Sequence, residues 1–278
     1  MRYRLLALDV DGTLLDPTGQ LRSTVRHAVL AVQQRGVRVV LCTGRRFRTA
    51  RPIAQALQIP GPLIVHNGAL VKDCASGTTL LQRSMSPDVH QEAVELLRTL
   101  STPMLYVDAF DDNVDIVTEP VHRAHPFQRE YLQDALPHCR IVETLATPPA
   151  HGVLLMSIMA DSESVQALRP VLAQRLGQRG YVHMLTNTNY QGSILEVLQA
   201  GVSKWQALEQ LASQEGIQTA EIMAVGDDRN DMAMLRYAGL GVAMGNAAAD
   251  VQAVADVVTG SNADDGLAQA LEHFLLRT

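Results

Sequence analysis

Two carboxylates stand two residues apart at the point where the first apolar segment of the chain ends. Leu5–Leu8 predicts a buried strand, and the segment 9–13, which reads DVDGT, follows it directly. Carboxylates at a buried strand end lose hydration and repel each other unless a cation lies between them. Open α/β sheets bind their ligands at the carboxyl ends of their strands. The pair Asp9 and Asp11 therefore indicates chemistry at the edge of such a sheet.

Three further polar clusters follow predicted strands or begin predicted helices. Thr43 and Gly44 end a second apolar strand, Lys204 begins a helix, and Asp227 and Asp231 follow another buried strand. Because the carboxyl ends of parallel strands share one edge, we expect these clusters to converge. Carboxylate oxygens suit a hard cation such as Mg²⁺, and an ammonium with free helix amides would stabilise a phosphoryl group. The combination predicts phosphoryl transfer.

The order of the predicted elements indicates an α/β protein with a second domain inserted into the first. Strands and helices alternate over 1–83 and again over 191–278, which is typical of a doubly wound parallel, Rossmann-like sheet. Over 84–190 strands neighbour strands, which indicates an antiparallel sheet with helices on one face. We therefore predict a core domain made of 1–83 and 191–278 and an inserted α+β domain at 84–190.

The composition narrows the classes of partner. The 278-residue chain has 23 Lys and Arg against 29 Asp and Glu, and no long basic run that would predict nucleic-acid binding. Its three cysteines, an odd number far apart, predict reduced thiols rather than disulfides or a zinc site. No segment approaches the roughly 20 apolar residues of a membrane span, and the start of the chain is unlike a signal peptide. We expect a cytoplasmic protein without a membrane partner.

Six motifs together resemble those of the haloacid dehalogenase (HAD) superfamily of phosphatases, specifically its Cof-like branch, in which a large C2-type cap is inserted between the second and third motifs. They occur in the family's order and span the chain. The motifs are 9–13 (DVDGT), 41–45 (LCTGR), 66–69 (HNGA), 201–204 (GVSK), 226–231 (GDDRND) and 241–247 (GVAMGNA). The resemblance implies a Mg²⁺-dependent hydrolase of small phosphorylated metabolites, in which the inserted domain is the cap.

The resemblance also implies roles for the four aspartates. Asp9 is expected to be the nucleophile that forms an aspartyl-phosphate. Asp11 is expected to protonate the leaving alcohol and then to activate water as a base. The Mg²⁺ would be held by the Asp9 carboxylate, the Asp11 carbonyl oxygen and Asp227. Asp231 would be a supporting ligand, acting through water or by orienting Asp227.

Four further residues are expected to bind the phosphoryl group. The resemblance implies that Thr43 and the Gly44 amide hold its oxygens. Lys204 would neutralise the charge that the nucleophile and the phosphoryl group share, and Asn230 would reach a phosphate oxygen or orient Lys204. Lys204 lies in the first turn of its predicted helix, where the helix dipole disfavours a cation by about 0.3–1 kcal/mol. A bound anion would offset that cost.

Several other polar residues have two interpretations. Arg45 could face the entrance of the phosphate site or the solvent. Asn67 could bind substrate or only make the turn after the third strand, and Asn246 could only cap the next helix. In the inserted domain, the polar cluster 122–125 could contact the leaving group of the substrate or form a solvated loop.

Several activities are compatible with this set of residues. We predict a phosphatase acting on a small phosphomonoester, with sugar phosphates ahead of nucleotide, flavin or pyridoxal phosphates, working as a monomer or small homo-oligomer. A sugar phosphomutase would use Asp9 and Asp11 in the same way. A receiver-like signalling module also forms an aspartyl-phosphate, but receivers are about half this length and carry the reactive aspartate on a middle strand. A dehalogenase is disfavoured, because the acidic cluster would then have no purpose.

Overall fold

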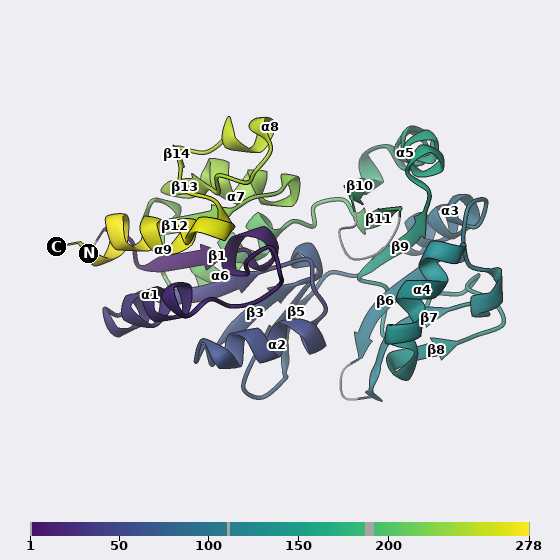
Figure 1. Ribbon diagram of the computed structural model, residues 1–278. Coiled ribbons are helices and arrows are strands. Elements are labelled where there is room, and N and C mark those ends of the chain that lie inside the picture. The colour runs from purple at the N-terminus through teal and green to yellow at the C-terminus, as the bar shows by residue number, and fades with distance from the viewer. Residues whose placement is uncertain (1, 110–111, 187–191, 278) are drawn as a thin grey trace. The chain divides into compact units, whose positions relative to one another are not determined.

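The computed structural model describes residues 2–109, 112–186 and 192–277, and the chain forms two compact units. The core unit comprises 1–81 and 203–278, and the cap unit comprises 82–202 (Figure 1). The predicted inserted domain is therefore present, and each unit has its own sheet.

The core unit is built on an eight-stranded sheet. Its strands, in spatial order, are β14 (Val257–Val258), β13 (Leu240–Ala243), β12 (Ile222–Gly226), β1 (Leu5–Leu8), β2 (Arg38–Cys42), β3 (Pro62–Val65), β4 (Leu70–Asp73) and β5 (Thr79–Gln82). The six strands from β14 to β3 are parallel, and β4 runs antiparallel to β3. Strand β1 is apolar throughout and fully buried, as expected for a central parallel strand covered on both faces.

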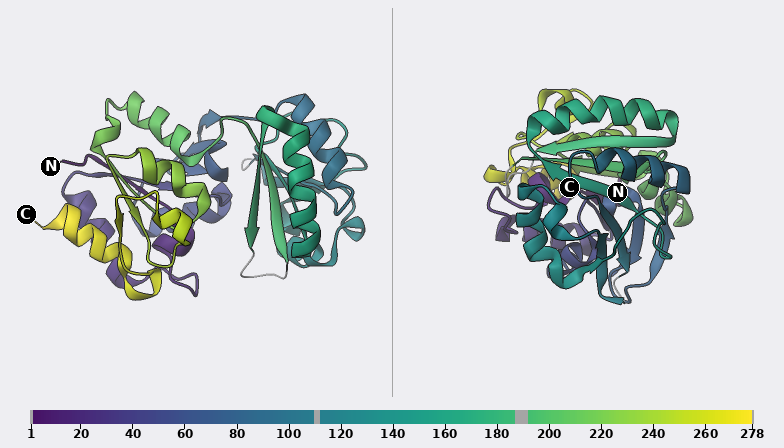
Figure 2. Two further views of the ribbon diagram at one scale, coloured as in Figure 1. Left: turned by 90° about the horizontal axis from the view of Figure 1, so that it is seen from above. Right: turned by 90° about the vertical axis from the view of Figure 1, so that its right-hand side faces the viewer.

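Helices cover both faces of the core sheet, which confirms the predicted doubly wound α/β fold. Residues of helices α6 and α7 pack with the side chains of Leu5 and Ala7 on one face of the sheet. Helices α1 and α9 contact each other and lie on the opposite face (Figure 2). The helices of this unit are α1 (Ser23–Gln34), α2 (Phe47–Ala56), α6 (Lys204–Gln214), α7 (Met232–Tyr237), α8 (Ala249–Gln252) and α9 (Gly266–Leu271).

The described residues of the cap unit form a six-stranded sheet and three α-helices. Its strands, in spatial order, are β10 (Gly180–Thr186), β11 (Ser193–Gln199), β9 (Leu155–Ala160), β6 (Met104–Ala109), β7 (Val114–Thr118) and β8 (Cys139–Ile141). The helices are α3 (Pro87–Leu97), α4 (Pro126–Ala135) and α5 (Ser162–Leu176). The sheet is antiparallel as predicted except for the pair β7 and β8, which is parallel because the connection through α4 crosses over before β8 begins.

The predicted end of the cap at 190 is wrong, because the cap unit extends to Val202. Strand β11 pairs along its whole length with β10, and it also pairs with β9. Its side chains Leu195 and Val197 belong to the apolar core of the cap. The prediction assigned this strand to the second part of the core domain, because an apolar strand next to a domain boundary fits either sheet by its pattern alone.

Candidate active site

The predicted polar clusters of the core unit lie at the carboxyl ends of adjacent strands. Asp9 follows β1, and its backbone N–H donates to the Val225 carbonyl oxygen of β12 at 3.0 Å. Thr43 follows β2, and its N–H donates to the Ile64 carbonyl oxygen of β3 at 2.8 Å. Asp227 follows β12. The parallel register thus places these residues at one edge of the sheet, as the sequence predicts.

Lys204 bridges two of the buried carboxylates. Its helix α6 begins directly after Ser203, whose hydroxyl accepts from the Gln206 N–H and caps the helix. The Lys204 ammonium donates to Asp9 Oδ1 at 2.6 Å and to Asp231 Oδ1 at 2.7 Å, and the lysine side chain is 1% exposed. A lysine so deeply buried is stable as a cation because it is paired with carboxylates.

Asp231 holds the loop that follows β12. Its Oδ2 accepts from the backbone N–H groups of Asp227 and Asp228, each at 3.0 Å, while its Oδ1 accepts from Lys204. An added Cβ at Gly226 would lie 2.5 Å from the Asp231 Cγ atom, so this approach requires glycine. Because both of its oxygens already accept hydrogen bonds, Asp231 is placed to orient the Asp227 loop, which is one of the two roles that the sequence suggested.

Asp227 is half-buried and is oriented by neutral donors. Its Oδ1 accepts from the Thr13 hydroxyl at 2.8 Å, and its Oδ2 accepts from Asn246 Nδ2 at 3.3 Å. The carboxylate also lies against the backbone of Gly12, where an added Cβ would be 2.1 Å from Asp227 Oδ2. Gly12 has a φ of +81°, which a glycine adopts without strain.

The pKa values of Asp9 and Asp227 are raised in this site. Burial, followed by the charge of Asp231, raises the pKa of Asp9 well above its ordinary value. The same two causes raise the pKa of Asp227 to about 7. Burial by itself would lower the pKa of Lys204, but the charges of Asp231 and Asp9 outweigh it and raise that pKa. Among the described residues, Lys204 is the only cation hydrogen-bonded to these three carboxylates, so the site has a surplus of negative charge.

The donor set fits a hard divalent cation. One carboxylate oxygen from each of Asp9, Asp227 and Asp231 lies within 4.8 Å of the others. Mg²⁺ prefers one or two carboxylates and keeps several waters. Both Asp231 oxygens already accept hydrogen bonds, one from Lys204 and the other from backbone N–H groups. Asp9 and Asp227 are therefore the carboxylates best placed to ligate a cation. The predicted ligation by the Asp11 carbonyl oxygen stays a prediction.

Asp11 lies outside this buried cluster and is paired with Arg45. The Arg45 Nε and Nη2 atoms donate to the two Asp11 carboxylate oxygens at 2.7 and 2.6 Å, and the Asp11 side chain is 59% exposed. The hydrogen bonds to Asp11 raise the pKa of the Arg45 guanidinium. Of the two interpretations of Arg45, the structure supports a position in the site, where it holds the carboxylate of Asp11.

The residues predicted to bind phosphate come together with Asn67. The buried Thr43 hydroxyl accepts from the Arg45 N–H at 3.1 Å, and the Thr43 carbonyl oxygen accepts from the Asn67 N–H at 3.1 Å. Asn230 Nδ2 donates to Asn67 Oδ1 at 3.0 Å, and a Cβ at Gly44 would lie 3.1 Å from that same oxygen. Asn67 makes its turn with φ +56°. Asn67 therefore makes the predicted turn and also contacts a side chain predicted to bind phosphate, while its own binding of substrate stays a prediction.

Thr13 and Asn246 are site residues whose roles the sequence did not reveal. Thr13 lies inside the first motif, but its neutral hydroxyl gave no reason to predict a contact with Asp227. A helix cap alone was one of the two interpretations of Asn246, but its Nδ2 donates to both Asp227 and the Gly12 carbonyl oxygen. The available signal was its place after β13, the strand next to β12 in the sheet.

The polar cluster 122–125 belongs to the cap unit, and within that unit His125 has a structural role. Its Nδ1 accepts from the Phe127 N–H at 3.3 Å and caps helix α4, and its Nε2 lies 3.9 Å from Asp161 Oδ2. Contact between this cluster and a substrate stays a prediction.

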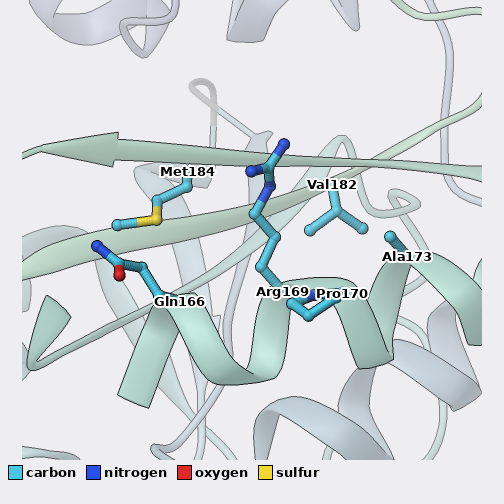
Figure 3. A pocket seen from close by; sticks show the side chains of 6 residues that line it. All are labelled: Gln166, Arg169, Pro170, Ala173, Val182 and Met184. Carbon is cyan, nitrogen blue, oxygen red and sulfur yellow. The ribbon is translucent and has the colours of Figure 1, made fainter. Parts of the chain in front are cut away.

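A hollow of about 420 Å³ lies on the cap unit between α5 and β10 (Figure 3). Among its described lining residues, Arg169 is the only one with a charged side chain. The lining residues are Gln166, Arg169, Pro170, Ala173, Val182 and Met184. The described lining residues of this hollow include no carboxylate, histidine or thiol, whereas the core-unit cluster brings three carboxylates and a lysine together. No helix in the described part of the chain is long and apolar enough to cross a membrane.

Together, the parallel core sheet, the inserted α+β unit and the lysine-bridged carboxylates at the strand ends define a capped α/β enzyme. The sequence model of the haloacid dehalogenase-like hydrolase family matches residues 6–271, and the chain belongs to this family. A solved haloacid dehalogenase-like hydrolase from Bacteroides thetaiotaomicron has a similar structure, with a TM-score of 0.78 at 27% identity, covering 98% of this chain and 99% of that one.

Two curated relatives of the chain are named as phosphatases. The HMP-PP phosphatase of Cronobacter sakazakii is 33% identical over 247 residues, which cover 88% of this chain and 85% of the relative. The 5-amino-6-(5-phospho-D-ribitylamino)uracil phosphatase YcsE of Bacillus subtilis is 29% identical over 273 residues, which cover 98% of this chain and 96% of the relative. The predicted family, fold class and enzyme class, a phosphatase of the HAD superfamily, are thereby confirmed.

Proposed function

We propose that the chain is a Mg²⁺-dependent phosphatase that hydrolyses a small phosphomonoester through an aspartyl-phosphate at Asp9. The observation that carries the proposal is the buried triad in which Lys204 binds Asp9 at 2.6 Å and Asp231 at 2.7 Å. It fixes one oxygen of Asp9 and leaves the other for attack on phosphorus.

In the first step, the free carboxylate oxygen of Asp9 attacks the phosphorus atom and the ester oxygen leaves. The Thr43 hydroxyl, the Gly44 amide and the Lys204 ammonium stabilise the charge on the phosphoryl oxygens. Asp11 gives its proton to the leaving alcohol. Both Asp11 carboxylate oxygens accept hydrogen bonds from Arg45, so Asp11 has to leave this pair before one of its oxygens can face the leaving group.

In the second step, Asp11 acts as the base. It takes a proton from water, the water oxygen attacks the phosphorus, and the bond from phosphorus to Asp9 breaks. The products are inorganic phosphate and the free Asp9 carboxylate, which returns to its hydrogen bond with Lys204. Asp9 and Asp227 would hold Mg²⁺, with the Asp11 carbonyl oxygen, and the cation would neutralise charge shared by the carboxylates and the phosphoryl oxygens.

The relatives support a small phosphorylated metabolite as the substrate. Their printed names include an HMP-PP phosphatase and a phosphatase of a ribitylamino-uracil phosphate. A sugar phosphate is our first choice, followed by nucleotide, flavin and pyridoxal phosphates. The proposal includes a cytoplasmic enzyme that works as a monomer or small homo-oligomer, without nucleic-acid or membrane partners.

Phosphate release from a panel of small phosphomonoesters tests the proposal. Wild type is compared with Asp9→Asn, which keeps the size of the side chain and a hydrogen-bond acceptor for Lys204 but removes the nucleophile. Release is expected to need both Mg²⁺ and Asp9, and a labelled phosphoryl group should appear on wild type after rapid acid quench. Isomeric sugar phosphate without free phosphate would indicate a mutase instead. If no substrate in the panel releases phosphate in the presence of Mg²⁺, the proposal is contradicted.

A further inference from the structure

One side-chain amide links two loops of the acidic site. Asn246 Nδ2 donates to the Gly12 carbonyl oxygen at 2.9 Å and to Asp227 Oδ2 at 3.3 Å. A primary amide has two N–H donors, and both are used here. Asn246 thus ties the loop that carries Asp9 and Asp11 to the loop that carries Asp227.

The chain also fixes the orientation of this amide. The Asn246 Oδ1 atom accepts from the backbone N–H of Asn262 at 3.0 Å. Turning the amide over would lose that bond and would set its oxygen against the Gly12 carbonyl oxygen and the Asp227 carboxylate. Three acceptors facing one another repel, so one orientation is strongly preferred.

Asn246 orients its carboxylate without neutralising it. The Gly12 carbonyl oxygen and Asp227 Oδ2 are both acceptors, and they lie close together only because a donor stands between them. An amide carries no positive charge, so its hydrogen bond orients Asp227 without cancelling the negative charge that a cation would need. Lys204 does the opposite for Asp9, because its ammonium partly cancels the charge that it contacts.

We infer that Asn246 is a positioning residue of the divalent-cation site. It holds Asp227 and the 9–13 loop in the relative placement at which both can ligate one Mg²⁺. The inference rests on the proposed function, since it concerns the cation that this function requires. Loss of a group that orients a metal ligand typically weakens metal binding about 10- to 100-fold.

Calorimetric titration of the metal-free protein with Mg²⁺, without substrate, tests the inference. Asn246→Ala is expected to raise the Mg²⁺ dissociation constant about 10- to 100-fold. Asn262→Ala is the matched control, because it removes the bond from Asn262 Nδ2 to the Leu15 carbonyl oxygen but keeps the backbone N–H that orients Asn246. The control is expected to bind Mg²⁺ like wild type.

Phosphate release against Mg²⁺ concentration gives a second readout. In Asn246→Ala the half-saturating Mg²⁺ concentration should rise by the same factor as the dissociation constant. At saturating Mg²⁺, kcat and the substrate KM should return to within a few-fold of wild type. Asn246→Ser, whose single hydroxyl donor cannot serve both acceptors, serves if the alanine variant does not fold, and should weaken Mg²⁺ binding in the same direction.

The possible results separate the inference from the proposed function. A wild type that neither binds Mg²⁺ nor releases phosphate overturns both. A Mg²⁺-dependent wild type together with an unchanged dissociation constant in Asn246→Ala overturns only the inference. Equal weakening in Asn246→Ala and Asn262→Ala also overturns it, because the effect would then come from the integrity of the 245–262 segment rather than from the amide.

Discussion

The loop after β1 carries two aspartates that lie in opposite environments. The Asp9 side chain is 6% exposed and shares a buried ammonium with Asp231, whereas the Asp11 side chain is 59% exposed and binds an arginine. Each carboxylate has a cationic partner, so the two differ in hydration rather than in pairing. Burial fixes Asp9 in one geometry, and exposure lets Asp11 exchange protons with water.

The difference shows how one loop can supply two chemical roles. An attacking carboxylate benefits from a fixed position and few waters, while an acid and base has to gain and lose a proton in each cycle. Two residues of the same type, separated by one valine, acquire these properties only from what surrounds them. If burial suits Asp9 to attack and exposure suits Asp11 to transfer protons, substitutions on the two sides should have different effects on stability and on rate.

Removing the buried cation should have the largest effect. Lys204→Met leaves Asp9 and Asp231 buried without their partner, which is expected to cost about 3–5 kcal/mol of unfolding free energy and nearly all activity. Urea unfolding of the metal-free protein near neutral pH measures the loss. The double variant Lys204→Met/Asp231→Asn should recover part of the stability but none of the activity. A loss of unfolding free energy below about 1 kcal/mol, the size expected for an exposed ion pair, would contradict the claim that Lys204 stabilises the buried carboxylates.

Removing the exposed carboxylate should affect rate but not stability. Asp11→Asn is expected to lower kcat about 10²- to 10⁴-fold for an alkyl phosphate, because proton transfer is lost. An aryl phosphate, whose leaving group needs no proton, should be affected less in its first step, which burst kinetics would show. The unfolding free energy should change by no more than about 0.5 kcal/mol. Equal losses in the first-step rate for both substrates would argue against Asp11 as the acid.

The stability of the metal-free protein should fall as pH rises. Burial and the charge of Asp231 raise the pKa of Asp227 to about 7, and burial also raises that of Asp9. Above the ordinary carboxyl pKa near 4 and up to about pH 7, the folded state keeps a proton at Asp227 that the unfolded chain has lost. Each such group lowers the unfolding free energy by up to about 1.4 kcal/mol per pH unit in that window.

Urea unfolding between about pH 5 and about pH 7 measures this slope. Asp227→Asn should flatten it, and Mg²⁺ should reduce it in wild type by favouring the ionised carboxylates. The exposed control Asp11→Asn should leave the slope as it is in wild type. A wild-type profile that is flat without metal would contradict the expected strain between the buried carboxylates.

Breaking the exposed pair should have the smallest effect. Arg45→Met removes the two hydrogen bonds to Asp11, and a pair that is this accessible contributes at most about 1 kcal/mol of stability. Activity should change more than stability if Arg45 also guides Asp11 between its two roles. If Arg45→Met lowered the unfolding free energy as much as Lys204→Met, the buried Asp9 pair and the exposed Asp11 pair would not differ in their contribution to stability.

Much of the site was predictable because parallel strands end at a common edge. The positions of Thr43 and Asp227 follow from that rule and from the apolar strands that precede them. The partner of Arg45 did not follow, because a long side chain can reach several places and only the folded loops decide among them. The role of Asn246 was hidden for the same reason, since a neutral amide has no preference for metal chemistry until its neighbours are known.

The fold was predicted with one error of assignment, and its cause is physical. Strands β1, β2 and β12 are short apolar runs separated by helices, and this order dictates a parallel sheet. Strand β11 has the same apolar character, but it lies between a cap strand and a core helix along the chain. Only its hydrogen bonds to β10 and β9 place it in the cap sheet. The apolar pattern of a single strand does not specify which strands it pairs with.

Two glycines of the site leave no room for a side chain. A methyl group at Gly12 would displace the Asp227 carboxylate, and one at Gly226 would displace that of Asp231. In a library of all single substitutions selected for activity, these two positions should be depleted as severely as Asp9, although neither has any chemistry of its own. At these two positions, selection for activity therefore has to exclude every side chain as strictly as it retains a reactive group elsewhere in the site.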